Sequence, residues 1–303
     1  MVGNFEQLLL LISTPIYIVL IGLEFFLSYL HERKFYTLSD TASNVYLMLC
    51  NMGLDFLMRG IAFFTLMFAY QYRLISFDQG FWYWFALFIA EDFIFYWLHR
   101  VDHSCRLFWS VHVTHHSSDQ FNLTTGFRSS VFQPLYRFLW FIPLALLGFQ
   151  AIDIFLMYSV TQIYGIIIHT QMVNKLGWLE YILVTPSHHR VHHASNVPYL
   201  DKNLGMVLIF WDQLFGTFEK EGAELPIRYG LYEKEISRDP VNVIFHEWKS
   251  LWQDLRRPLP FRTKLAYLFN PPGWSHDQTT KTSRQLREER QRKIHNKQVS
   301  HKH

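Results

Sequence analysis

HRVDHSCRLFWSVHVTHH, residues 99–116, is the stretch around which the rest of this chain is organised. Two histidine clusters lie in it and a third follows: His99-x-x-x-His103, His112-x-x-His115-His116 and His189-x-x-His192-His193. Histidines three or four residues apart lie on one face of a helix, so each cluster can direct several imidazoles at one point. Eight imidazoles from separate segments are more than one metal ion needs. The pattern therefore predicts a site for two metal ions.

Other roles for these histidines explain the pattern less well. A lone histidine is more often a hydrogen-bonded core or surface residue than a metal ligand. That role gives no reason for three clusters of matching form, with ten of the sixteen histidines between positions 99 and 193. A structural zinc site commonly uses cysteine, and this chain has only Cys50 and Cys105. Haem binding would account for paired histidines but not for the repeats. The two cysteines also imply a reducing compartment without a disulfide framework.

Composition indicates an integral membrane protein with a sizeable polar portion. Half of the residues are hydrophobic and 18% are aromatic, while the net charge is only +3. We expect an all-α fold without a nucleic-acid partner. The predicted parts are transmembrane helices over 1–98, a histidine-rich catalytic region over 99–220 with a membrane hairpin at 132–168, a cap segment over 221–280, and a basic tail over 281–303 that is disordered or at most a frayed helix.

The predicted topology brings the histidines to one side of the membrane. Three apolar runs precede His99, and the two arms of the 132–168 hairpin return the chain to the side it left. Basic residues gather on that side: Arg33, Lys34, Arg100, Arg106, Arg128, Lys175, Arg190 and the tail. By the positive-inside rule we expect a cytoplasmic helical cap that carries the site. The membrane would be the inner membrane in a bacterium or the endoplasmic reticulum in a eukaryote.

Asp92 is a candidate supporting carboxylate. It lies seven residues before His99 on the same helical stripe. A carboxylate within reach of a ligand imidazole fixes its tautomer and raises its basicity. The alternative interpretation is a helix-end residue at the membrane interface.

Four segments carry a resemblance to a known family. EDFIFYWLHRVDH (91–103), HVTHH (112–116), HHRVHH (188–193) and DKNLGMVLIFWDQLFGTFEKE (201–221) resemble the fatty acid hydroxylase/sterol desaturase superfamily of membrane-bound non-haem di-iron enzymes. The resemblance covers about residues 85–220. Within it, HHSSDQFNLTTGFRSSV (115–131) and TPSHHRVHHASN (185–196) are most similar to the alkylglycerol monooxygenase branch. That branch implies cleavage of ether lipids by hydroxylation, with tetrahydrobiopterin as reductant.

The resemblance also implies which residues hold the two irons. The implied ligands are His99, His103, His112, His115, His116, His169, His189, His192 and His193. His188, which is extra to the third cluster, would be a further ligand or a support. Asn196 and Asp201 would orient histidines or line the site, and turn residues in a loop are an equal alternative.

The function predicted from these features is a membrane-bound di-iron monooxygenase that uses O2 to hydroxylate a lipid C–H bond. Its electrons would come from reduced pterin or a donor protein. Zinc could replace iron in the isolated protein, because imidazole sites hold zinc more tightly than Fe(II). One alternative is a sterol or fatty-acyl hydroxylase or desaturase of the same superfamily. Another is a membrane metal-binding or transport protein, which would place its ligands inside the spans near the midplane.

Overall fold

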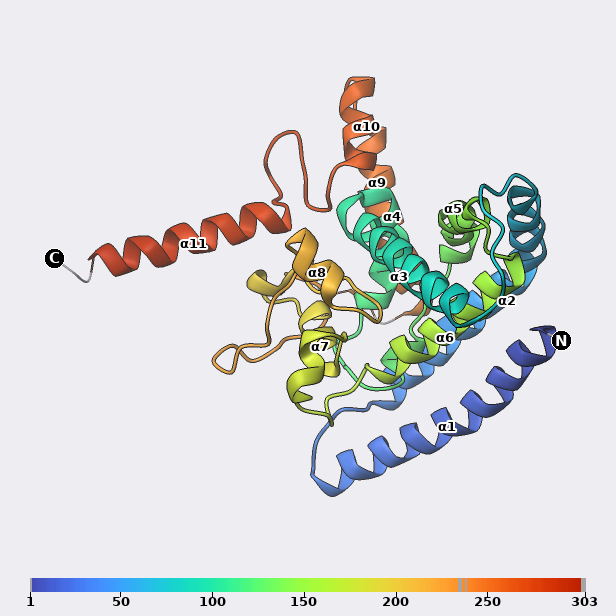
Figure 1. Cartoon of the computed structure of the whole chain (residues 1–303). Coiled ribbons are helices and arrows are strands. Elements are labelled where there is room, and N and C mark those ends of the chain that lie inside the picture. Colours follow the sequence, from blue (N-terminus) through green and yellow to red (C-terminus); the bar gives the residue numbers. More distant parts are fainter. Residues whose placement is uncertain (1, 234–235, 238, 301–303) are drawn as a thin grey trace.

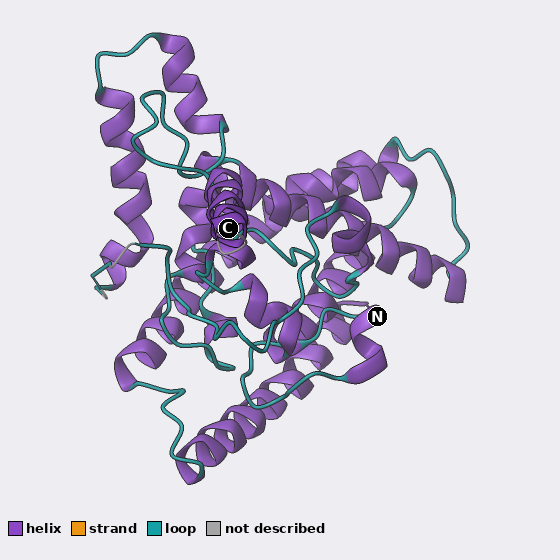
Figure 2. Cartoon of the chain, turned by 90° about the vertical axis from the view of Figure 1, so that its left-hand side faces the viewer, coloured by secondary structure: helices purple, strands orange, loops and turns teal. Residues whose placement is uncertain are grey.

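The computed structural model describes residues 2–233, 236–237 and 239–300, which form helices joined by loops (Figures 1 and 2). The α-helices are α1 (Val2–Leu30), α2 (Leu38–Gln71), α3 (Phe81–Ser104), α4 (Arg106–His116), α5 (Ile142–Leu147), α6 (Ala151–Ile167), α7 (Pro186–His192), α8 (Phe210–Phe215), α9 (Pro240–Arg256), α10 (Phe261–Phe269) and α11 (Ser283–Ser300). Short 3-10 helices are η1 (Thr125–Phe127), η2 (Gln133–Leu135), η3 (Arg137–Phe141), η4 (Gly177–Tyr181) and η5 (Val197–Tyr199). No strand occurs among these residues, so the predicted all-α class is confirmed.

Three long helices are suited to a membrane. Leu11–Leu30 of α1, all of α2 and all of α3 are long and apolar enough to cross a bilayer. Thr37 caps the start of α2: its hydroxyl accepts a hydrogen bond from the backbone N–H of Asp40 at 3.3 Å, and the Asp40 carboxylate suits the positive end of the helix dipole. These three helices agree with the membrane spans that the sequence predicts for residues 1–98.

The hairpin at 132–168 differs from two simple apolar arms. Its first arm is divided into η2, η3 and α5, because Pro134 and Pro143 lack the N–H that a continuous helix needs. Its turn contains Gly148 at a φ of 120°, where an added Cβ would lie 2.1 Å from the carbonyl oxygen of Ile75. Only the second arm, α6, is one regular helix.

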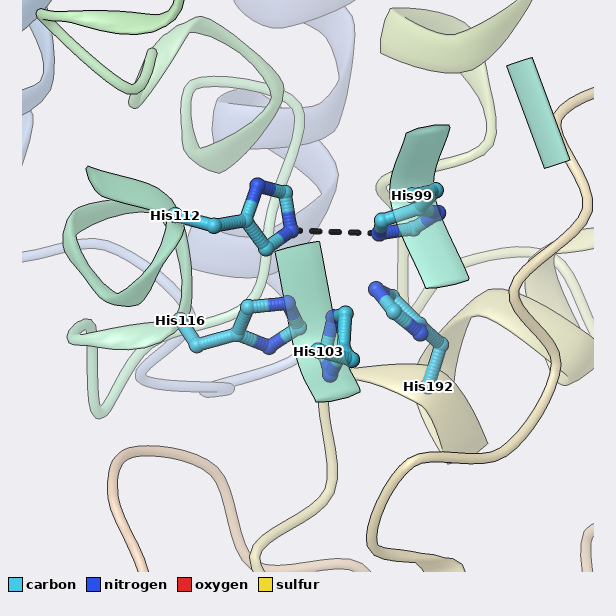
Figure 3. Close-up of side chains that lie close together, drawn as sticks. All are labelled: His99, His103, His112, His116 and His192. Atoms are coloured by element: carbon cyan, nitrogen blue, oxygen red, sulfur yellow. Dashed lines mark hydrogen bonds between the residues drawn. The ribbon is translucent and has the colours of Figure 1, made fainter. Parts of the chain in front are cut away.

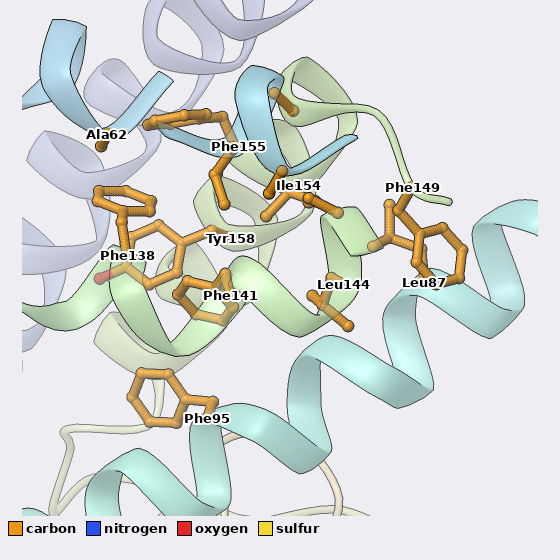
Figure 4. Close-up of a cluster of buried hydrophobic side chains, with 14 of the residues drawn as sticks. Ala62, Leu87, Phe95, Phe138, Phe141, Leu144, Phe149, Ile154, Phe155 and Tyr158 are labelled. Carbon is orange, nitrogen blue, oxygen red and sulfur yellow. The ribbon is translucent and has the colours of Figure 1, made fainter. Parts of the chain in front are cut away.

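The main hydrophobic core lies among α2, α3, α5 and α6 (Figure 4). Its fully buried members include Leu66, Leu87, Phe141, Leu144 and Ile154. Burying one such side chain contributes about 1.5–3 kcal/mol. The core reaches Phe95, whose ring centroid lies 5.8 Å from that of His99 one turn later. Packing of the membrane helices therefore fixes the point at which the histidines begin.

The C-terminal basic segment, expected to be a disordered tail or a frayed helix, is helical as far as Ser300. Residues Ser283–Ser300 form α11, which extends away from the rest of the chain (Figure 1). Its glutamate, arginine and lysine residues are good helix formers and pair four apart, as in Arg284–Glu288 at 2.9 Å. Arg287 also donates to the backbone oxygen of Leu200 at 2.6 Å. Residues 301–303 lie outside the described range.

Candidate metal centre

Four segments bring the histidines together. The end of α3 carries His99 and His103, and α4 follows after a break at Cys105 with His112, His115 and His116. His169 lies just beyond α6, and α7 with its C-terminal neighbour supplies His189, His192 and His193. The nine candidate ligand histidines therefore lie at or just beyond the C-terminal ends of α3 and α6 and along α4 and α7, which meet at one place.

The histidines form two groups. The five-histidine cluster contains His99, His103, His112, His116 and His192 (Figure 3), and the four-histidine cluster contains His115, His169, His189 and His193. In each group one ring nitrogen per residue lies within 4.8 Å of the others. Each group comprises histidines alone among the described residues. The nine members are the nine ligands that the family resemblance implies.

Each adjacent HH pair serves both clusters. His115 and His116 belong to different groups, and so do His192 and His193. Successive residues on a helix point about 100° apart, so two neighbours diverge toward two points. The two clusters are adjacent: the ring of His116 in one stacks on the ring of His193 in the other, with 4.5 Å between the centroids. The repeated HxxHH form thus lets one short helix contribute histidines to both clusters.

The outer ring nitrogens are held by acceptors that fix the tautomers. Backbone carbonyls accept from Nδ1 of four rings: His99 to Leu204 at 2.7 Å, His115 to Arg128 at 3.0 Å, His169 to Gly165 at 2.7 Å and His192 to Lys202 at 3.1 Å. A carbonyl oxygen can only accept, so Nδ1 carries the proton in each ring. The Nε2 lone pairs consequently point inward, toward the other imidazoles.

These inward nitrogens fit metal ions. Nε2 of His169 lies 3.4 Å from Nε2 of His115, and both are acceptors because both Nδ1 atoms donate elsewhere. In the five-histidine cluster, Nε2 of His103, His116 and His192 is buried without a hydrogen-bond partner in the described structure. Buried lone pairs that face one another are unfavourable unless a cation lies between them. Neutral imidazole is a ligand for iron, copper, zinc and nickel, so each cluster can hold one such ion.

Two aspartates flank the five-histidine cluster. Asp201 accepts from Nδ1 of His103 at 3.1 Å, which is one of the roles that the resemblance offers. Asp102 was not singled out from the sequence; it is fully buried, and its Oδ2 lies 3.7 Å from Nδ1 of His112. Tyr136 and Gln133 also donate to Asp102, at 2.7 and 3.0 Å. Its position one residue before His103 was the available signal.

The other candidates lie away from both clusters. Nδ1 of His188 accepts from the backbone N–H of Thr185 at 3.3 Å and completes a capping box at the start of α7. Asn196 donates to Pro226 and accepts from Arg228, so it joins two loops. Asp92 accepts from the backbone N–H groups of Val207 and Leu208 and from the indole of Trp211, at 3.0, 3.1 and 3.0 Å. Asp92 therefore holds the loop that follows Leu204. Because the Leu204 carbonyl accepts from His99, Asp92 supports His99 indirectly through this loop.

The four-histidine cluster is covered by an aromatic pair tied to α1. The Phe121 ring lies against His169 and His193, at 5.5 and 5.1 Å between centroids, and stacks on Tyr229 at 4.9 Å. The buried Glu24 of α1 holds this loop by accepting from the backbone N–H of Leu123 at 2.8 Å, and Tyr36 and Thr170 also donate to it. Apolar cover of this kind excludes water from the site.

A cleft reaches the five-histidine cluster from the side of α9 to α11. Its volume is about 870 Å³, and its lining includes His103, His116 and His192. Trp109 of α4 forms part of its wall, with its ring centroid 5.1 Å from that of His103. The rest of the lining is largely polar and includes Arg106, Glu247, Asp254 and Lys281. A polar molecule can therefore approach one cluster without crossing the apolar core.

Burial keeps the clusters neutral. Burial first, and neighbouring imidazoles second, lower the pKa of His112, His116, His189, His192 and His193 well below 6.5. Burial also lowers the pKa of His115 to about 4. Metal binding requires neutral imidazole, so these rings are ready to bind at physiological pH.

The same shifts predict acid sensitivity of the metal-free protein. The unfolded chain takes up protons at its imidazoles below a pH of about 6.5, whereas the buried rings resist protonation. The free energy of unfolding should keep the contribution of these neutral imidazoles above that pH and lose it as the pH falls toward 4. His115 alone would account for up to about 3 kcal/mol of the loss. Thermal unfolding of the chelated protein in detergent checks this, and a Tm that stays constant from about pH 7 to about pH 5 would exclude it.

Comparison with known proteins agrees with this arrangement. Residues 84–217 match the family model described as fatty acid hydroxylase. The chain is 35% identical over 266 residues to alkylglycerol monooxygenase of Homo sapiens, covering 86% of this chain and 59% of that protein. The Danio rerio alkylglycerol monooxygenase is 33% identical over 270 residues, with 87% and 59% covered. An ornithine lipid hydroxylase of Rhizobium tropici is 34% identical over 132 residues, with 43% and 40% covered.

This chain spans about three fifths of the length of these alkylglycerol monooxygenases. No solved structure matches it. The region that matches the family model, residues 84–217, contains every histidine of both clusters. Over that region the chain is similar to the fatty acid hydroxylase family.

Proposed function

We propose that this protein is a membrane-bound lipid monooxygenase with one iron ion in each histidine cluster and an alkylglycerol ether lipid as its substrate. The observation that carries the proposal is the pair of all-imidazole clusters whose Nε2 atoms face inward side by side. The relatives named alkylglycerol monooxygenase support the choice of substrate.

Iron in these clusters would activate O2 for attack on an unactivated lipid C–H bond. The chain's own part is to hold each imidazole in one tautomer, to keep Nε2 unprotonated and to exclude water. The outward bonds to Leu204, Arg128 and Gly165 perform the first task, and the Phe121–Tyr229 stack contributes to the last. Zinc is expected at the same positions in protein produced without added iron, because of the divalent affinity order.

The site lies where a lipid chain can reach it. His99 and His103 are at the end of α3, a candidate span, while the other seven cluster histidines lie outside the candidate spans. A transport protein would instead place its ligands near the midplane of the membrane. The exposed basic residues Arg33 and Lys34, between α1 and α2, support a cytoplasmic location for this end of the spans.

The cleft beside the five-histidine cluster suits the electron donor. Its polar lining suits a soluble donor better than an acyl chain. Tetrahydrobiopterin or a donor protein would therefore deliver electrons from the cap side, while the lipid arrives from the bilayer. This separation of the two paths is part of the proposal.

The reaction can be followed by its products. Hydroxylation of the carbon next to the ether oxygen consumes O2, two electrons and two protons, and yields water and a hemiacetal, which splits into a fatty aldehyde and glycerol. With 18O2 the label should appear in the aldehyde, because the original ether oxygen leaves with glycerol. Mass spectrometry of membranes supplied with an alkylglycerol and reduced pterin tests this.

Other members of the same family would give other products. A hydroxylated chain with an intact ether or ester linkage would indicate a sterol or fatty-acyl hydroxylase, and a new double bond without label would indicate a desaturase. Either result would overturn the ether-lipid assignment while leaving the metal centre in place. An acylglycerol of equal chain length is the matched control, since its carbon at the linkage is a carbonyl and cannot be hydroxylated.

A further inference from the structure

A hairpin of two helices presents an apolar stripe that no described residue covers. α9 exposes Val241, Phe245 and Trp252 at 56, 46 and 57% of their surface. The next helix, α10, continues this with Phe261, Leu265 and Phe269 at 73, 36 and 58%. Spacings of four and seven residues place each set on one helix face. α10, the second helix of this hairpin, projects from the body of the molecule (Figure 1).

The opposite face of α9 already has its packing partners. Val243, Ile244 and Leu251 are buried there. Glu247 and Asp254 pair with Arg106 at the start of α4, at 2.9 and 2.7 Å. The helix is therefore anchored to the cap by its inner face. Its outer stripe is free to meet something else.

Cationic side chains run along the edge of the stripe. Lys249 and Arg256 are exposed on α9 beside Trp252, and the Arg256 guanidinium lies 5.2 Å from the centroid of the Trp252 ring. Arg262 is exposed on α10 in the same way. Aromatic residues flanked by lysine and arginine are typical of helices that lie in the headgroup region of a membrane.

The stripe is continuous with the surface of the membrane helices. The Phe132 ring lies 5.7 Å from Phe245 and 6.3 Å from Trp248, centroid to centroid. From Phe132 the chain enters the apolar hairpin, where Leu135 and Leu139 are 49 and 57% exposed. Leu47 of α2 packs in the same small core as Val243 and Ile244. A bilayer that surrounds α2 and this hairpin therefore reaches the start of α9.

We propose that the α9–α10 hairpin lies in the interface of the bilayer that the long helices span. Val241, Phe245, Trp252 and the α10 residues enter the acyl boundary, and the basic edge meets anionic headgroups. A second copy or another protein would have to compete with lipid for a stripe that adjoins lipid-facing surface. Because the inner face of α9 holds Arg106, lipid binding by its outer face also fixes α4, which carries three of the cluster histidines.

The test uses the full chain in bilayer nanodiscs and needs no turnover. Cys50 and Cys105 are first replaced by serine in a background whose metal content matches wild type. A single fluorophore is then attached at Trp252→Cys, at Leu265→Cys or at Gln253→Cys. Gln253 is the matched control, because it is exposed on the same helix at the polar side of the basic edge. Quenching by nitroxide lipids is compared with quenching by a water-soluble agent.

We expect several-fold stronger lipid quenching at positions 252 and 265 than at 253, and the reverse order for the aqueous quencher. Adding anionic lipid should increase the contrast. Equal aqueous quenching at all three positions would overturn the proposal. Shielding of positions 252 and 265 from both quenchers would also overturn it, because that result would mean that protein covers the stripe. If the background that lacks both cysteines does not fold, the measurement is repeated in a background that keeps Cys105. The thiol of Cys105 is buried, so the fluorophore does not label it.

Discussion

Replacing one histidine in either cluster should remove metal and activity together. His112→Ala in the five-histidine cluster and His189→Ala in the four-histidine cluster each delete one inward imidazole from a buried site. Loss of a residue that only supports a ligand already costs about 10–100-fold, so loss of a ligand should cost at least about 100-fold in activity. Metal analysis should show about two ions per wild-type chain and fewer in each variant.

His188→Ala is the matched control for this experiment. His188 is as buried as its neighbour His189, lies on the same helix, and belongs to neither cluster. Its loss removes half of a capping box, which should cost about 1 kcal/mol of stability and leave the metal content unchanged. The two-cluster account is wrong if His112→Ala and His189→Ala retain both metals and full activity.

Loss of Arg128 should have the largest effect on stability. Its guanidinium is buried and donates to the backbone oxygen of Thr114, the hydroxyl of Ser117 and the side chains of Asp40 and Asn44. Arg128→Met would remove one donor from the partly buried Asp40 carboxylate and from several buried acceptors, which should cost about 3 kcal/mol. The Arg128 backbone oxygen also accepts from His115, so the four-histidine cluster should lose metal affinity.

Thermal unfolding in detergent measures this effect. Arg284→Met is the control, because that side chain is 84% exposed on α11 and its pair with Glu288 should be worth under about 1 kcal/mol. Adding Asp40→Asn to Arg128→Met should recover part of the loss, since the neutral amide tolerates burial better than a carboxylate. An Arg128→Met protein with the Tm of wild type would show that this ion pair does not hold α2 to α4.

Local spacing was enough to name eight of the candidate ligand histidines, and the family resemblance added His169, but neither divided them between two clusters. The HxxHH form indicates imidazoles on one helix face, and all nine histidines named from the sequence lie in the two clusters. Which of His115 and His116 belongs to which cluster depends on how α4 meets α7 and His169. Those contacts join residues far apart in the chain, so helical periodicity does not contain them.

The supporting residues were harder to predict for the same reason. Asp92 shares a helical stripe with His99, yet its partners are Val207, Leu208 and Trp211, more than 110 residues later. Asp102 was overlooked although it adjoins His103, because a single aspartate has no spacing pattern to identify it. Asp201 reaches His103 through a loop whose backbone adopts a φ of 54°, a conformation that aspartate tolerates.

Helices could be placed from the sequence where length, hydrophobicity and helix propensity decide the structure. The three long apolar runs became α1, α2 and α3, because length and hydrophobicity decide a membrane helix. The first arm of the 132–168 hairpin was divided at its prolines, which a reading of hydrophobicity alone does not register. In α11, helix-forming residues and pairs four apart favour the helix over the disordered tail, the two alternatives that composition left open.

Oxygen uptake by metal-exchanged protein tests the central claim most directly. The purified protein is stripped of metal, reloaded with Fe(II) or Zn(II), and supplied with an alkylglycerol and reduced pterin. Zinc has no redox chemistry, so the account predicts uptake and fatty aldehyde from the iron form and neither from the zinc form, with about two metal ions per chain in both. Equal turnover by the zinc form would contradict it.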